Sequence, residues 1–392
     1  MEPLRGRIRD YAWGSRTAIA TLQGRPVPSA GPEAELWLGA HPGAPGLVDR
    51  PDGPASLADL VAAEPADWLG PEVTARYGDR LPFLLKVLAP EAPLSLQAHP
   101  DAEQARAGFA AEEAAGGDGP RNYVDPYHKP EMLVAASPFE ALCGFRDPAR
   151  SAEVLAAFGV AALDQVVAAL RTGPAGLPDA VRTLLAWPYS ERGKLLDAVR
   201  AADVPADFDA SAGLLRRLAE RYPEDPGVLV ALLLNHVILA PGEAIWMPAG
   251  NLHAYLHGVG VEILAASDNV LRGGLTPKRV DVAELIRVLR FEVLDDPVFG
   301  AVPVAPGVVT WPVPIGDFAL HGVRPTDDGP VRLDLPGPRV VLCWSGRIEA
   351  RDERGAVVLG RGEAAVGPAG AGPLLLSGTG EAYVASVGTD EG

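Results

Sequence analysis

Apolar side chains recur every three or four positions through the middle of the chain, over residues 150–234. The repeat is clearest in three runs: Val160, Leu163, Val166, Val167 and Leu170; Leu177, Val181, Leu184 and Leu185; and Leu214, Leu215 and Leu218. This spacing places the apolar side chains on one face of a helix. Breaks such as Gly173-Pro174 and Tyr222-Pro223 divide the stretch. The pattern therefore predicts a module of short helices.

Short apolar segments bounded by proline or glycine lie on both sides of this module. They cover residues 81–89, 94–99, 132–135, 237–239, 259–266, 331–335 and 339–344. Segments of this length and flanking composition are typical of strands in a sandwich or barrel. We therefore expect a mainly β protein with a helical module placed between two strand-rich stretches.

One nine-residue segment occurs twice. The sequence GEAIWMPAG at residues 242–250 returns 120 positions later as GEAAVGPAG at residues 362–370, with six of nine positions identical. Either chance similarity between two stretches rich in the same residues, or two related β-barrel domains, explains the match. In the second copy Pro373 stands at the position of His253, so we expect no metal site there.

Composition narrows the class of protein. Gly and Pro number 44 and 39 of 392 residues, which indicates many turns, and 48% hydrophobic residues argue against disorder. A net charge of −17 disfavours extended binding to nucleic acid. The first residues lack a signal-peptide pattern, and no apolar run is long enough to cross a membrane. Two cysteines far apart fit a reducing compartment, so the expected location is the cytoplasm, without membrane or nucleic-acid partners.

Three polar patches interrupt the apolar strand segments. Alternate residues of a strand share a face, so Gln97 lies beside His99, Lys129 beside Glu131, and His253 beside Tyr255 and His257. These strands would together present an amide oxygen, two imidazoles and a carboxylate, a donor set that suits a divalent metal such as zinc. The other histidines, His41, His236 and His321, are interpreted as packing or surface residues.

A second candidate site lies just after the third patch. Arg272 and Lys278 flank a glycine-containing loop that leads into a predicted helix over residues 280–289, with Asp281 near its start. Such a pair of cations can grip a phosphate dianion, although a solvated basic loop would look the same. Lys86, Lys129 and Lys278 are three of only four lysines in the chain. We therefore expect a local positive pocket in an acidic protein.

The motifs together resemble type I mannose-6-phosphate isomerases, a zinc-dependent family with the cupin fold. The matching segments are YAWGS at 11–15, LPFLLK at 81–86, LSLQAHPD at 94–101, YHKPE at 127–131, FEALCGF at 139–145, and residues 241–278. They cover about a third of the chain in the family's order. Ser15, where the family usually has glycine, is a mild departure.

The resemblance implies a fold of two cupin-type jelly-roll β-barrels plus an inserted α-helical domain. Residues 1–149 and 236–298 would form the catalytic cupin domain, residues 150–235 the helical insert, and residues 299–392 a degenerate barrel without metal. It also implies one Zn²⁺ per chain. The implied ligands are Gln97, His99, Glu131 and His253.

The resemblance also implies roles for the residues that line the pocket. Arg272 would be the active-site arginine, Lys278 would bind phosphate, and Trp13 belongs to a motif that could contact the sugar. Further pocket residues would be Lys129, His128, Tyr255, Glu262 and Asp268.

The implied reaction interconverts D-mannose 6-phosphate and D-fructose 6-phosphate through a cis-enediol. A cation beside the C1 and C2 oxygens would stabilise the charge that develops there. Our hypothesis makes Lys129 part of the acid/base machinery and His128 a candidate for ring opening. Glu262 and Asp268 remain alternatives for the base.

Two other functions are compatible with a cupin pocket. An Fe(II) oxygenase usually has a second imidazole where Gln97 stands, and it needs no Arg272 or Lys278 for phosphate. A non-catalytic sugar-phosphate-binding cupin could dispense with Lys129, His128 and Glu262. The expected partner is a small phosphorylated sugar, and the expected state is a monomer, with an oligomer as the alternative.

Overall fold

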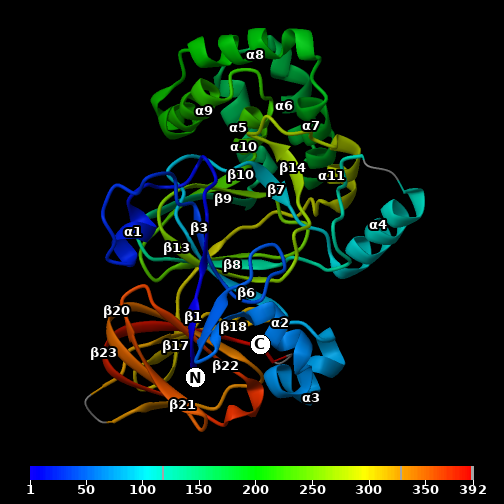
Figure 1. The fold of residues 1–392 in the computed structure, drawn as a ribbon. Coiled ribbons are helices and arrows are strands. Elements are labelled where there is room, and N and C mark those ends of the chain that lie inside the picture. The colour runs from blue at the N-terminus through cyan, green and yellow to red at the C-terminus, as the bar shows by residue number, and fades with distance from the viewer. Residues whose placement is uncertain (117–118, 327–328, 390–392) are drawn as a thin grey trace.

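The computed structural model describes residues 1–116, 119–326 and 329–389. The protein is mainly β with several helices, as the sequence predicted. Two sheets lie in the middle of the molecule, a third sheet at one end, and a group of helices at the opposite end (Figure 1). No helix in the described ranges is long and apolar enough to cross a membrane.

The two middle sheets pack face to face. One consists of β2 (Arg7–Arg9), β3 (Glu35–Leu38), β6 (Phe83–Leu88), β8 (Glu131–Ala135), β11 (Ala244–Met247), β13 (Gly260–Ala265) and β15 (Val298–Phe299). The other consists of β7 (Leu96–Ala98), β9 (Phe139–Phe145), β10 (Leu234–Leu239), β12 (His253–His257) and β14 (Leu271–Gly274). Their orders are β15-β11-β8-β13-β6-β3-β2 and β10-β9-β12-β7-β14. Leu133 from the first sheet and Phe139 and Tyr255 from the second share one buried core.

The third sheet combines both ends of the chain. Its strands are β1 (Glu2–Arg5), β4 (Leu47–Arg50), β5 (Gly53–Ser56), β16 (Val302–Ala305), β17 (Val308–Thr310), β18 (Ala319–Val323), β19 (Val331–Leu333), β20 (Arg339–Asp352), β21 (Gly355–Gly360), β22 (Ala364–Gly367) and β23 (Leu374–Ser386). The main path is β16-β17-β18-β23-β20-β22-β1-β4-β5, with β19 on β23 and β21 on β20. Strands β1, β4 and β5 come from residues expected in the first part of the catalytic domain, yet they pair in the sheet of the C-terminal strands.

The repeated nine-residue segment forms the same turn twice. Gly242 and Gly362 both have positive φ, at 91° and 79°, and each turn leads into a strand, β11 or β22. The side chains of Glu243 and Glu363 each accept a backbone N–H from three residues earlier, at 2.7 Å. The sequence match therefore corresponds to a repeated local structure.

The helical module lies between β9 and β10, where the apolar repeat predicted it. Its elements are α5 (Pro148–Ala157), α6 (Asp164–Leu170), α7 (Leu177–Leu185), α8 (Tyr189–Ala201), α9 (Asp209–Arg221) and α10 (Gly227–Ala231), with the 3₁₀ turns Ala161–Leu163, Pro174–Gly176 and Ala206–Phe208. Their apolar faces share a core with Leu96 of β7 and Leu252 before β12. The module is therefore packed on the sheet that carries β7 and β12.

Among the described residues, five further helices lie outside the module, and the sequence predicted one of them. They are α1 (Ala18–Leu22), α2 (Leu57–Ala63), α3 (Pro65–Tyr77), α4 (Ala102–Ala115) and α11 (Val282–Val288), besides a 3₁₀ turn at Ala369–Ala371. Helix α11 lies within the expected range 280–289 but begins two residues later, after Asp281, whose side chain caps it by accepting from Glu284 N. Helix α4 buries only Ala105, so it has no apolar stripe to detect, and a capping box formed by Asp101 and Gln104 starts it.

Candidate metal centre and cavity

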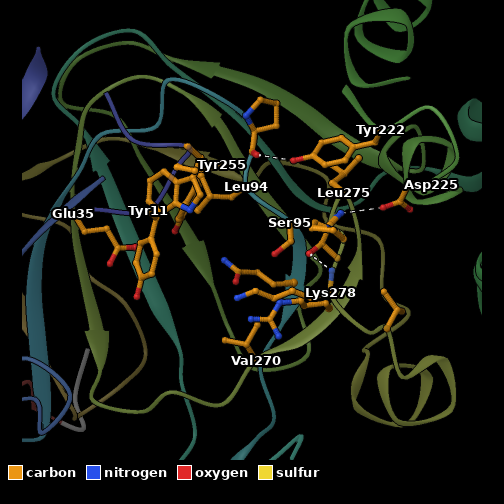
Figure 2. A pocket seen from close by; sticks show the side chains of 18 of the residues that line it. Tyr11, Glu35, Leu94, Ser95, Tyr222, Asp225, Tyr255, Val270, Leu275 and Lys278 are labelled. Carbon is orange, nitrogen blue, oxygen red and sulfur yellow. Dashed lines mark hydrogen bonds between the residues drawn. The ribbon is translucent and has the colours of Figure 1, made fainter. Parts of the chain in front are cut away.

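A cavity of about 1420 Å³ opens between the middle sheets and the helical module (Figure 2). Its wall contains all the predicted site residues except His99, His128 and His253. Lys86, Lys129 and Lys278 line it too, as three of the four lysines. The wall carries seven cationic side chains and six carboxylates among the described residues. The cavity is thus nearly balanced in charge, in contrast to the strongly acidic chain.

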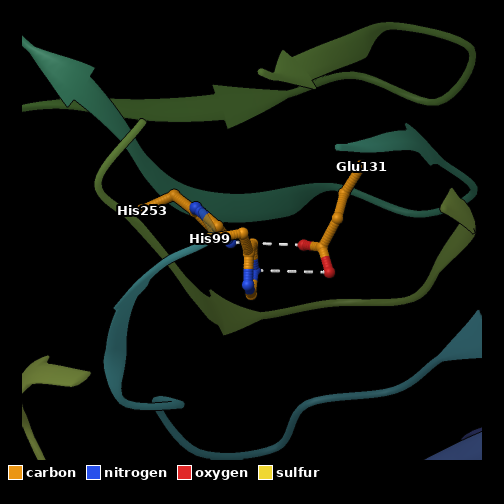
Figure 3. A group of neighbouring side chains, drawn as sticks. All are labelled: His99, Glu131 and His253. Atoms are coloured by element: carbon orange, nitrogen blue, oxygen red, sulfur yellow. Dashed lines mark ion pairs between the residues drawn. The ribbon is translucent and has the colours of Figure 1, made fainter. Parts of the chain in front are cut away.

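His99, Glu131 and His253 form a buried cluster, although they come from three different strand segments (Figure 3). His99 Nε2 lies 3.4 Å from Glu131 Oε1, and His253 Nε2 lies 3.3 Å from Glu131 Oε2. One possible ligand atom from each residue lies within 4.8 Å of the others. The spacing leaves room for a single ion between the three side chains.

Hydrogen bonds to the backbone orient both imidazoles. Nδ1 of His99 lies 2.7 Å from Asn269 O, and Nδ1 of His253 lies 3.1 Å from Asn251 O. A proton on each Nδ1 satisfies these carbonyls and leaves a lone pair on each Nε2. Both Nε2 atoms and Glu131 Oε2 are buried without a hydrogen-bond partner. Buried polar atoms left unpaired are costly, so this donor set fits a divalent cation.

Burial and the neighbouring charges favour the protonation states that bind metal, a neutral imidazole for His99 and an ionised carboxylate for Glu131. Burial lowers the pKa of His99 to about 4, which keeps its imidazole neutral at physiological pH. Burial alone would raise the pKa of Glu131, but Lys129 and the imidazoles hold it well below its usual range. Lys129 Nζ lies 3.0 Å from Glu131 Oε1.

Strand register adds Gln97 and Arg272 to the same surface. Across the sheet, Gln97 on β7 lies between His253 on β12 and Arg272 on β14. Arg272 is half-buried, and burial lowers the pKa of its guanidinium. No hydrogen bond or ion pair to its side chain occurs within the described ranges, so a cation faces the cavity unpaired. Gln97 is placed where its amide oxygen can join the metal ligands.

The opposite wall holds a row of charged side chains. Lys86 on β6 lies opposite Glu262 on β13, and their Nζ and Oε2 atoms are 3.1 Å apart. Burial raises the pKa of the Glu262 carboxyl, against the effect of Lys86. Glu35 on β3 also lines this wall and lies 3.9 Å from Lys86 Nζ. Nothing in the sequence selected Glu35, and Lys86 was noted as one of four lysines and as the end of the matching segment at 81–86.

The far end of the cavity is formed by a fixed loop. Asp225 Oδ2 accepts from Thr276 N at 3.0 Å, which ties the helical module to the loop after β14 (Figure 2). Leu275 in this loop has a φ of 54°, an uncommon conformation for a leucine. Lys278 follows it at the exposed edge of the cavity.

The structure separates His128 from the other predicted residues. Its Nε2 lies 2.9 Å from Asp317 Oδ1, a buried carboxylate in the C-terminal part of the chain, and it does not line the cavity.

His41 lies in the wall of the cavity, although from the sequence it was interpreted as a packing or surface residue. Its Nε2 lies 3.4 Å from the exposed carboxylate of Asp268, and burial lowers its pKa.

Two of the predicted site residues are aromatic, Trp13 and Tyr255, and they are buried to different extents. Trp13 stacks on Tyr11 with ring centroids 5.7 Å apart at the cavity wall. Tyr255 is buried against Phe139, and its hydroxyl has no hydrogen-bond partner among the described residues. Both reach the cavity, so neither is only a core residue.

A mainly β protein with a strand-borne His-Glu-His cluster beside a large polar cavity has the architecture of a mononuclear metalloenzyme. A family model described as phosphomannose isomerase type I, catalytic domain, matches residues 1–148. Mannose-6-phosphate isomerase of Escherichia coli (strain K12) is 36% identical over 391 residues, which covers 97% of this chain and 98% of that protein. Mannose-6-phosphate isomerase 1 of Arabidopsis thaliana is 30% identical, covering 93% and 89%.

Solved structures give the same result. A crystal structure of a phosphomannose isomerase variant from Salmonella typhimurium has a TM-score of 0.90 at 34% identity, covering 99% of this chain and 100% of that one. A zinc-bound mannose 6-phosphate isomerase has a TM-score of 0.89 at 34% identity, covering 99% of each chain. The chain belongs to the type I phosphomannose isomerase family. These relatives favour neither the oxygenase nor the non-catalytic binding protein.

Proposed function

We propose that this protein interconverts D-mannose 6-phosphate and D-fructose 6-phosphate with one zinc ion per chain. The observation that carries the proposal is the buried His99-Glu131-His253 cluster, with unpaired ligand atoms beside a cavity that also holds Lys86 and Arg272. The names of the relatives and the zinc in a similar structure support it.

The proposed zinc ligands are His99, Glu131, His253 and Gln97. One carboxylate against a dication leaves a net positive centre. When bound, zinc would act as a Lewis acid toward the C1 and C2 oxygens of the open-chain sugar.

Proton transfer is assigned to the wall opposite Arg272. The reaction moves a proton from C2 to C1, through a cis-enediol, so the base must take up the proton and be able to return it. Glu262 is the proposed carrier, because its pKa is raised in a buried site that lines the cavity. Lys129 is proposed to assist as a cation, since its Nζ is held by Glu131 at 3.0 Å.

The remaining side chains are assigned to binding. Arg272 and Lys278 would hold the phosphate or the enediolate oxygens, and Trp13 would contact the sugar. Tyr255 and Asp268 would shape the pocket. His128 receives no direct role, because it pairs with Asp317 outside the cavity wall.

We propose the cupin jelly-roll fold for both barrels, with the helical insert at residues 150–235. The repeated turn at Gly242 and Gly362 supports two related barrels. The proposed catalytic domain spans residues 1–149 and 236–298, apart from the three early strands that pair in the sheet of residues 299–392. Two unpaired buried cysteines support the cytoplasm as the compartment, and a monomer is the proposed state.

A coupled assay for fructose 6-phosphate, with metal analysis, tests the proposal. Turnover of mannose 6-phosphate should be lost on chelation and restored by zinc, with about one zinc per chain. Iron with oxygen consumption would support an oxygenase instead. Binding of the sugar phosphate without turnover by the zinc-loaded protein would show a binding protein and contradict the proposal.

A further inference from the structure

Glu35 is a buried carboxylate that none of the motifs assigns. Its Oε2 lies 3.9 Å from Lys86 Nζ, and the same nitrogen lies 3.1 Å from Glu262 Oε2. The three side chains are 9%, 7% and 3% exposed. Figure 2 shows Glu35 on the wall of the cavity. One ammonium group is therefore shared by two buried carboxylates.

The sheet fixes this arrangement from three neighbouring strands. Trp37 lies opposite Lys86, and Lys86 lies opposite Glu262, so their side chains share one face. Trp37 Nε1 donates to Glu35 Oε2, the oxygen that faces Lys86. The Lys86 nitrogen also lies 5.1 Å from the centroid of the Trp37 ring. Glu35 is thus held in place by a neighbour on its own strand.

A single ammonium cannot fully neutralise two carboxylates in a buried site, because each carboxylate weakens the attraction for the other. We propose that Glu35 is a positioning residue for proton transfer: it holds Lys86 between two carboxylates and so keeps Glu262 basic enough to take the proton from C2. The inference rests on the proposed isomerase function. It deepens that function by explaining how the base is tuned.

The surroundings of Glu262 agree with this role. Facing it are Lys86 on β6, Glu35 on β3, Glu131 on β8 with Lys129 just before it, and Tyr255 on β12. Burial is the largest cause of the raised pKa of Glu262, Lys86 lowers that pKa, and the two other carboxylates raise it. If the charge of Glu35 is removed, Glu262 is the one remaining carboxylate of the two that pair with Lys86.

The test is the pH dependence of kcat/KM in the zinc-loaded protein. Glu35→Gln keeps the size of the side chain and an oxygen for Trp37, but it removes the charge. Glu262 should then lose its proton at lower pH and be a weaker base. We expect the acid limb to move down by roughly half to one pH unit, and kcat at the plateau to fall about three- to tenfold, with unchanged zinc content.

Three variants separate charge from structure. Glu35→Asp keeps the charge and should keep the acid limb near the wild-type position. Trp37→Phe keeps a ring but frees Glu35 to approach Lys86, so its acid limb should move to higher pH. Glu33→Gln removes a buried carboxylate two residues away that pairs with Arg25 at 2.6 Å and does not line the cavity, so its profile should match the wild type.

If the acid limb of the kcat/KM profile stays in place or moves to higher pH in Glu35→Gln, the proposed role of Glu35 is overturned. It is also overturned if Glu35→Gln and Glu33→Gln lose the same amount of kcat and neither profile shifts in pH. If Glu35→Gln does not fold, the pH profile of kcat/KM for Trp37→Phe tests the proposal instead. An acid limb that keeps the wild-type position or moves to lower pH in Trp37→Phe overturns the proposal. A wild-type chain without turnover overturns the isomerase function together with this role. An active wild type with superimposable profiles overturns the role of Glu35 alone.

Discussion

Backbone carbonyls hold the Nδ1 atoms of the two imidazoles at hydrogen-bond distance and so help to set the direction of the rings. The carbonyl that holds His99 belongs to Asn269, a fully buried residue. The Asn269 side chain accepts from Val124 N at 2.8 Å and donates to Asp125 O at 2.8 Å. These bonds join the loop before β8 to the loop after β13. A polar side chain far from the reacting atoms thereby fixes the position of a ligand.

Lys129 offers a residue-scale prediction. Its Nζ offsets the charge of Glu131 beside the proposed zinc, so Lys129→Ala should lower kcat about 100-fold while zinc stays bound, because the substitution removes none of the four proposed ligands. The measurement is kcat together with zinc content. Lys194→Ala is the matched control, because this lysine lies on α8 and does not line the cavity. Near-normal turnover of Lys129→Ala with full zinc would rule out the role.

At the scale of elements, Glu140 on β9 links the helical module to the sheet. Its carboxylate lies 2.6 Å from His236 Nε2 on β10 and also pairs with Arg217 on α9. Burial opposes ionisation, yet His236 and Arg217 lower the pKa of Glu140 to about 2. A depressed pKa means that this contribution to stability is present above the usual value of 4.5 and is lost as the pH falls toward 2.

Glu140→Gln should therefore lower the free energy of unfolding at pH 7 by about 1 kcal/mol, a figure reduced for the exposure of Arg217. The difference from wild type should shrink between pH 4.5 and 2, as followed by denaturant titration at several pH values. Glu153→Gln is the control, because its pair with Arg150 within α5 is largely exposed. A difference that persists at pH 2 would show that the ion pairs are not its cause.

At the scale of the whole molecule, the C-terminal sheet and the seven-stranded middle sheet share a core. Val134 and Ile263 of the middle sheet lie in the same buried cluster as Val340 and Val366 of the C-terminal sheet. Strand β1 pairs with β22 on one side and β4 on the other. The two parts are thus joined by both packing and hydrogen bonding.

A fragment of residues 1–298 should consequently fail to fold alone, because β1 would lose β22 as a partner and the shared core would be exposed. We expect aggregation or a non-cooperative thermal transition by circular dichroism, and recovery when residues 299–392 are co-expressed. Cooperative unfolding of the isolated fragment with zinc bound would refute this.

The site was easier to predict from the sequence than the connections between sheets. Gln97, His99, Glu131 and His253 could be selected because alternation along a strand is local. The pairing of His128 with Asp317 depends on a residue far along the chain, so its side chain could not be placed. Glu35 was not selected, because its approach to Lys86 depends on the pairing of two strands, in which Trp37 lies opposite Lys86 and Glu35 opposite Leu88.

The secondary-structure elements also differ in how well the sequence predicted them. The helical module was visible as an apolar repeat, whereas α4 is specified by alanines and the cap at Asp101. The expectation that residues 1–149 belong to a single domain followed the order of segments along the chain, whereas β1, β4 and β5 pair in the C-terminal sheet. Local patterns carry no information on which distant strand completes a sheet, and so the place of β1 could not be predicted.

Leu4 and Ala364 are partners across one antiparallel ladder, with almost the entire chain between them. On the ribosome, the first strand therefore emerges long before the strand that will cover its edge. The C-terminal sheet cannot close until the residues of β22 have been made. The nascent polypeptide must carry the uncovered edge of β1 until then, which leaves that edge open to other chains or to chaperones during translation.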